Sequence, residues 1–147
     1  SKTYAVMLQK KIQKNLKIVF HKPHPEDLQI KTDSMRIRQV LDNLINNAIK
    51  FTEEGSIEIS CELAKDLVHF VVSDTGIGIA AEDYEKVFDR FRQLDEDFAR
   101  RKYGGVGLGL PIVKKLVELL GGNIWIEPGV ERGSQFHFTI SYNAVDN

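Results

Sequence analysis

The sequence predicts an α/β (α+β) two-layer sandwich, in which helices cover one face of a mixed, mostly antiparallel sheet. Two amphipathic helices and two pairs of short strands joined by turns support this class. A length of 147 residues and a hydrophobic content of 42% suit one packed core. We therefore expect a single domain over 1–147, with no internal repeat and no linker.

The N-terminal part predicts a short helix, then an extended segment, then a loop. Apolar residues recur at helical spacing over 3–14, and 16–20 reads as extended chain. Two prolines in the segment 21–25 fix the backbone and disfavour helix in the residues before them, so this segment is predicted to be a loop.

The clearest helix extends from Ser34 to about Lys50. Asp33 and Ser34 supply N-cap chemistry, and the apolar residues that follow fall on one stripe. After a turn at 53–55, the alternating segment 56–63 and the apolar run 67–72 predict a hairpin. Cys61 continues the alternation, so we expect it in the core.

The C-terminal part predicts a long loop, a second helix and a second hairpin. The polar and aromatic stretch 80–104 is typical of a functional loop. Pro111 suits the first turn of a helix over 112–120 that ends at two glycines. The segments 123–126 and 135–142 then pair around a Pro-Gly turn.

Composition limits the possible functions. A net charge of -1 argues against general binding of nucleic acid or anionic lipid. A single cysteine cannot form an intrachain disulfide or a cysteine-based zinc cluster, and it fits a reducing compartment. No apolar run approaches the roughly 20 residues that cross a membrane.

Polar residues of the first helix form a candidate site. Asn43, Asn47 and Lys50 fall on one stripe beside the apolar one. Amide oxygens can bind Mg²⁺ and an ammonium can neutralise phosphate, as a triphosphate–metal site requires. A solvated helix face would show the same pattern.

Asp74, Gly76 and Gly78 follow the predicted central strand. The glycines permit close approach of the backbone to a ligand, and the carboxylate suits an exocyclic amine such as that of adenine. The spacing also satisfies a loose dinucleotide fingerprint, although Asp74 argues against it. A turn with a helix-capping acid remains an alternative.

A second glycine cluster, 104–109, leads directly into the helix that starts near Pro111. Successive backbone N–H groups there and the positive helix end can converge on phosphate oxygens. No Gly-Lys-Ser/Thr follows, which excludes a P-loop, and the protein-kinase motifs are absent. The aromatic and basic segments 87–93 and 100–102 lie between the clusters; they could reach phosphate or simply form a solvated face.

Taken in order, these four segments resemble the N, G1, F and G2 boxes of the histidine-kinase catalytic domain. That domain is part of a wider family that includes Hsp90-type, gyrase-type and MutL-type ATPases. The stretches 38–52, 74–79 and 101–110 carry the resemblance most specifically. It implies a Bergerat-type fold with ATP and Mg²⁺ as ligands, and an ATP lid over 82–104.

The resemblance also implies a role for each matching residue. Asn47 would bind Mg²⁺, Asn43 and Lys50 would face the phosphates, and Asp74 would read adenine through a water shared with Ser134. Gly76 and Gly78 would shape the adenine pocket. The other nucleotide contacts would be Phe51, Ile79, Phe88, Phe91, Arg101, Lys102, Gly105, Val106, Gly107, Leu108 and Gly109.

One position separates kinases from hydrolases in the wider family. Hydrolytic members resemble one another in a glutamate general base four residues before the Mg²⁺-binding asparagine. Here that position is Asn43, and an amide cannot deprotonate water. Two departures from the pattern are Val106, where the G2 box more often has a hydroxyl, and Gln93, where some relatives place an arginine.

The resemblance implies a cytoplasmic protein-histidine kinase domain, monomeric, without nucleic-acid or direct membrane contact. None of the four histidines suits the phosphoacceptor, which family members carry on a helical dimerisation hairpin. We expect that hairpin before residue 1, with 1–14 as a linking helix and a response regulator receiver domain downstream. A hydrolytic ATPase and a degenerate nucleotide-binding module remain alternatives.

Overall fold

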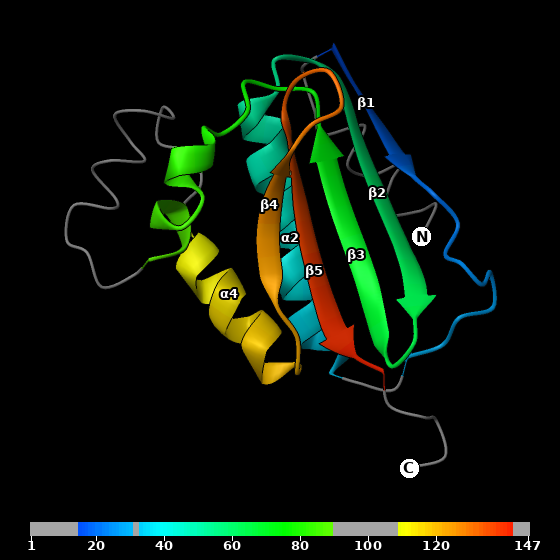
Figure 1. The fold of residues 1–147 in the computed structure, drawn as a ribbon. Coiled ribbons are helices and arrows are strands. Elements are labelled where there is room, and N and C mark those ends of the chain that lie inside the picture. Colours follow the sequence, from blue (N-terminus) through cyan, green and yellow to red (C-terminus); the bar gives the residue numbers. More distant parts are fainter. Residues whose placement is uncertain (1–14, 31–32, 90–108, 143–147) are drawn as a thin grey trace.

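The computed structural model describes residues 15–30, 33–89 and 109–142, which form a five-stranded sheet with helices on one face (Figure 1). The strand order is β1-β2-β3-β5-β4. The elements are β1 (Asn15–Phe20), α2 (Ser34–Phe51), β2 (Glu54–Ala64), β3 (Leu67–Asp74), η1 (Ala81–Asp83), η2 (Lys86–Phe88), α4 (Leu110–Leu119), β4 (Ile124–Pro128) and β5 (Ser134–Ser141). The predicted two-layer sandwich is confirmed.

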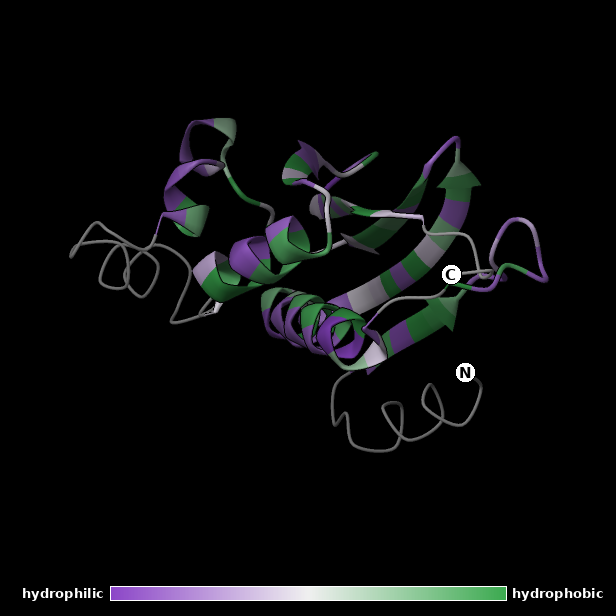
Figure 2. Cartoon of the chain, turned by 90° about the horizontal axis from the view of Figure 1, so that it is seen from below, coloured by the Kyte–Doolittle hydropathy of each residue, from purple (hydrophilic) through white to green (hydrophobic). Residues whose placement is uncertain are grey.

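Helix α2 forms because its start is capped and one of its faces is apolar. The Asp33 carboxylate accepts hydrogen bonds from the backbone N–H groups of Met35 and Arg36. Figure 2 shows the alternating hydrophobic and hydrophilic stripes of the helices. Residues of the apolar stripe are buried against the sheet: Val40, Leu44, Ile45 and Ala48.

The sheet is mixed because β1 pairs with β2 in parallel, whereas the other pairs are antiparallel. Glu54 and Gly55, predicted as a turn, are instead the first residues of β2, since they pair with the start of β1. Both predicted hairpins form, and β5 also lies against β3. The central strand is therefore β3, between β2 and β5.

The core lies between the sheet and the two helices. Phe70 and Phe138 stack there with ring centroids 4.6 Å apart. Cys61 keeps the predicted alternation but is only half-buried, so it lies at the margin of the core.

The predicted loop at 21–25 is irregular apart from one isolated bridge between His24 and Glu62. The two short helices η1 and η2 begin the predicted lid. The rest of the lid and the predicted helix at 3–14 lie outside the described residues. No helix in the described ranges is long and apolar enough to span a bilayer.

Candidate functional site

Asp74 is the last residue of β3, and its carboxylate is buried at one end of the sheet. Only 2% of the residue is exposed. The Gly76 N–H donates to Oδ1 at 2.9 Å, and the Ser134 hydroxyl donates to Oδ2 at 3.1 Å. Burial raises the pKa of this carboxyl above its usual value, although these hydrogen bonds oppose the change. The structure therefore holds an acceptor group in a position that is costly to keep charged.

The chain after Asp74 packs against neighbouring backbone with no room for side chains. A Cβ at Gly76 would lie 2.4 Å from the Phe51 carbonyl oxygen, which accepts a hydrogen bond from the Ile77 N–H at 3.3 Å. Gly78 has a φ of +76°, and a Cβ there would lie 3.1 Å from the Gly133 carbonyl oxygen. These glycines hold the end of α2 and the start of β5 close to Asp74.

Asn47 presents a buried amide on α2, one turn from the end of the helix. The residue is 4% exposed, and its Nδ2 has no hydrogen-bond partner among the described residues. A buried donor without a partner is costly, so this amide suits a ligand that supplies an acceptor. Lys50 is exposed in the last turn of the same helix. In the predicted polar stripe, the Asn47 amide is therefore buried and the Lys50 ammonium is exposed.

Asn43 contacts the residue that precedes α4. Its Nδ2 donates to the Gln39 carbonyl oxygen at 3.3 Å, and its Oδ1 faces Gly109. Gly109 is the N-cap of α4 with a φ of +92°, and Pro111 lies in the first turn. The start of α4, with its unpaired backbone N–H groups and positive dipole end, is therefore adjacent to the polar stripe of α2.

Three predicted contact residues belong to the hydrophobic core. Phe51, Ile79 and Phe88 are 3%, 8% and 9% exposed, and Phe88 meets Phe136 edge to face. Their contact with a nucleotide stays a prediction. The remaining predicted residues lie outside the described residues: Phe91, Arg101, Lys102, Gly105, Val106, Gly107 and Leu108.

One groove of the described residues lies away from Asp74. It has a volume of about 700 Å³ and is bounded by η2, α4 and β4, with Tyr84, Lys114 and Trp125 among its lining residues. The polar groups of the candidate site lie instead on α2, at the end of β3 and at the start of α4.

Comparison with known proteins identifies the class. The family model HATPase_c, described as "Histidine kinase-, DNA gyrase B-, and HSP90-like ATPase", matches residues 32–144. The chain belongs to this family of ATP-binding domains, as its fold and the polar groups around Asp74 indicate. Within the family, it is the catalytic ATP-binding domain of a sensor histidine kinase.

Curated relatives are long sensor kinases. The autoinducer 2 sensor kinase/phosphatase LuxQ of Vibrio vulnificus (strain CMCP6) is 42% identical over 134 residues, which cover 87% of this chain and 16% of that protein. The sensor histidine kinase WalK of Bacillus subtilis is 45% identical over 122 residues, 79% of this chain and 19% of that protein. The chain therefore spans less than a fifth of these relatives.

Solved structures share the fold. A nucleotide-free catalytic domain of the histidine kinase ThkA is 36% identical with a TM-score of 0.79, and the match covers 97% of this chain and 92% of that one. Full-length ShkA in complex with AMPPNP is 29% identical with a TM-score of 0.78, covering 99% of this chain and 30% of that one. The predicted Bergerat-type fold is confirmed.

Two contributors to the site carried no separate signal in the sequence. The Thr75 hydroxyl accepts a hydrogen bond from the Ser56 N–H at 3.0 Å and so ties the turn after Asp74 to β2. A Cβ at Gly133 would lie 2.0 Å from the Asp74 carbonyl oxygen. Gly133 precedes Ser134 directly, so its position beside a predicted site residue was the only available hint.

Proposed function

We propose that this domain binds ATP with Mg²⁺ and transfers the γ-phosphate to a histidine on a helical dimerisation hairpin. The phosphate would then pass to the receiver domain of a response regulator, in the cytoplasm. The buried, pre-positioned carboxylate of Asp74 is the observation that supports this proposal most strongly.

Asp74 would recognise the adenine base. Its carboxylate oxygens have lone pairs beyond those used by Gly76 and Ser134, and one can accept from the exocyclic amine. The direct hydrogen bond from the Ser134 hydroxyl keeps the carboxylate in one orientation before a ligand arrives. Gly76 and Gly78 let the turn after Asp74 pack against Phe51 and Gly133, and this tight turn would shape one side of the adenine pocket.

Asn47, Asn43 and Lys50 would hold the phosphates and the metal. The Asn47 amide oxygen suits Mg²⁺, and its Nδ2, which has no partner in the described part of the chain, suits a phosphate oxygen. The metal would neutralise charge on the phosphates, while the start of α4 adds backbone donors beside Gly109. The predicted contacts of Phe91, Arg101, Lys102, Gly105, Val106, Gly107 and Leu108 belong to the same proposal.

Asn43 favours transfer over hydrolysis. Its amide has no basicity to activate water, and it already donates to Gln39 and faces Gly109. The names of relatives agree: WalK is a sensor histidine kinase, and ThkA has been crystallised in complex with the response regulator protein TrrA.

Two measurements test the proposal. Isothermal titration of the chain with ATP should show saturable binding that Mg²⁺ strengthens. With γ-labelled ATP, the chain alone should remain unlabelled, whereas an added hairpin with the acceptor histidine of the parent kinase should acquire acid-labile label. Steady release of inorganic phosphate without transfer would contradict the kinase assignment, and no binding at millimolar ATP would indicate a degenerate module.

A further inference from the structure

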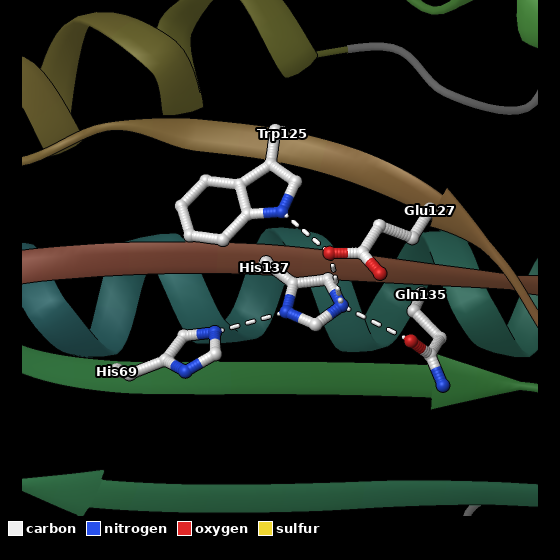
Figure 3. A network of polar contacts seen from close by, with 5 residues as sticks. All are labelled: His69, Trp125, Glu127, Gln135 and His137. Atoms are coloured by element: carbon white, nitrogen blue, oxygen red, sulfur yellow. Dashed lines mark hydrogen bonds and ion pairs between the residues drawn. The ribbon is translucent and has the colours of Figure 1, made fainter. Parts of the chain in front are cut away.

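Two histidines meet on the face of the sheet opposite α2 (Figure 3). His69 on β3 and His137 on β5 are diagonal neighbours, since His69 pairs with Thr139 and Val71 pairs with His137. His69 Nε2 lies 2.9 Å from His137 Nδ1. Trp125 stacks on both rings, with centroids 5.5 Å and 5.3 Å away.

Neighbouring oxygens fix the protonation of His137. Its Nε2 lies 3.0 Å from Gln135 Oε1 and 3.5 Å from Glu127 Oε2, and both oxygens accept hydrogen bonds. Nε2 therefore carries the proton, and the lone pair of Nδ1 points toward His69. Glu127 Oε2 also accepts from the Trp125 indole N–H at 2.8 Å, so the carboxylate is itself held in place.

This arrangement has the features of a metal-binding imidazole. A histidine ligand typically donates its second ring N–H to a carboxylate or carbonyl, which orients the ring and raises its basicity. At metal–nitrogen distances of about 2.0–2.1 Å, two imidazoles at right angles on one ion have nitrogens about 2.9 Å apart. His69 Nε2 and His137 Nδ1 already have this separation.

We propose that His69 and His137 bind a divalent transition-metal ion that favours imidazole and 90° angles, Cu²⁺ or Ni²⁺, with Glu127 as the group that orients His137. His69 would shift its proton from Nε2 to Nδ1, and both rings would turn so that their lone pairs point at the ion and no longer along the line between the two nitrogens. Water would complete the coordination, because the described residues contain no cluster of three or more His, Cys, Asp or Glu ligands.

The surrounding charges favour a cation. Glu127 contacts His137, and the exposed Glu62 on β2 pairs directly with His69 in the sheet register. Both carboxylates are placed beside the histidines by an ion pair or by the sheet register. The ion would link β3 to β5, whose ends carry Asp74 and Ser134, so binding should stabilise the folded domain.

Ni²⁺ is the first probe because it does not oxidise the half-buried Cys61 thiol. Titration of the whole chain by calorimetry should show one equivalent bound, and Ni²⁺ should raise the Tm. His69→Gln and His137→Gln should abolish both effects. Glu127→Gln, which keeps both ligands, should weaken binding by about tenfold.

His21 and His24 provide the matched controls, because they are the other two histidines of the chain and lie outside the cluster. His21→Asn and His24→Asn should bind Ni²⁺ as the unchanged chain does; loss of binding in either would overturn the proposal. In the unchanged chain, substoichiometric Ni²⁺ should broaden the NMR signals of the His69 and His137 rings first. Broadening of other histidines first, or no binding at all, would also overturn it.

Discussion

The Asn43 side-chain oxygen lies 2.9 Å from the point that a Cβ on Gly109 would occupy, so α2 and the start of α4 are in close contact there. Gly109→Ala should therefore lower the free energy of unfolding by about 1–3 kcal/mol, since an alanine at a φ of +92° is strained. It should also weaken ATP binding, because the start of α4 must shift. Urea denaturation and calorimetry measure the two effects.

Gly121→Ala is the control for this change, at the other end of α4. Gly121 has a φ of +84°, and a Cβ there would lie 2.4 Å from the Ser141 hydroxyl. The variant should lose comparable stability and keep the ATP affinity of the unchanged chain. If Gly109→Ala bound ATP equally well, the start of α4 would have no part in the site.

Asp74→Asn should affect the stability of the domain and its affinity for ATP in different ways. Burial raises the pKa of the Asp74 carboxyl, so its ionised form opposes folding at neutral pH. A neutral amide can keep the contacts with Gly76 and Ser134, and we expect equal or greater stability at pH 7. The loss of the charged acceptor should weaken ATP binding about 10- to 100-fold.

The pH dependence of stability tests whether burial of the Asp74 charge is the cause. In the unchanged chain, the buried charge of Asp74 lowers the free energy of unfolding at neutral pH. As pH falls through the raised pKa of this carboxyl toward about 3.9, protonation removes that charge. The difference in free energy of unfolding between the unchanged chain and Asp74→Asn should therefore narrow. Asp66→Asn, at an exposed turn position, should show no such trend. A difference that widened on acidification would contradict burial as the cause.

Asn47→Ala should weaken the binding of ATP with Mg²⁺ by about tenfold or more, because it removes a proposed metal ligand. The variant should lose most of the gain in affinity that Mg²⁺ gives the unchanged chain. Its stability should change little, since the buried Nδ2 has no partner to lose among the described residues. Asn46→Ala, at the adjacent exposed amide, is the control and should bind normally.

The surroundings of His137 should make the folded domain less stable in mild acid. Burial lowers the pKa of its imidazole, and the nearby His69 lowers it further, while Glu127 opposes both. The unfolded chain therefore takes up a proton near pH 6.5 before the folded chain does, and stability falls as pH drops below that value. Urea midpoints at pH 7.5, 6.5 and 5.5, measured with a chelator present, should reveal this slope.

The variant His137→Gln should remove part of that slope. His21→Gln, at an exposed position beside Glu58, should retain it. An unchanged slope in His137→Gln would assign the acid sensitivity to another group.

Local chemistry made much of the fold predictable. The Asp33 cap, the apolar stripe of α2 and the β2–β3 hairpin each depend on residues that are close together in the sequence, so a local pattern is enough to predict them. The parallel pairing of β1 with β2 and the place of β5 between β3 and β4 depend on distant segments, for which alternation contains no information.

The residues of the candidate site were also predictable only where a local motif contains them. Asp74, Gly76 and Asn47 stand in motifs that point to nucleotide chemistry, and the resemblance linked Ser134 to Asp74 through a water. The structure shows a direct hydrogen bond between side chains 60 residues apart. The meeting of His69 with His137, 68 residues apart, had no local signal in the sequence.

The position of β5 also determines when the domain can finish folding during synthesis. Until residues 134–141 are made, β4 has no neighbour in the sheet and one edge of β3 stays unpaired. At typical translation rates this lasts roughly 3–13 s after Asp74 is made. Through that interval the edge of β3 along Val68, Phe70 and Val72 lacks its β5 neighbour, and an unpaired strand edge of this kind can pair with other chains.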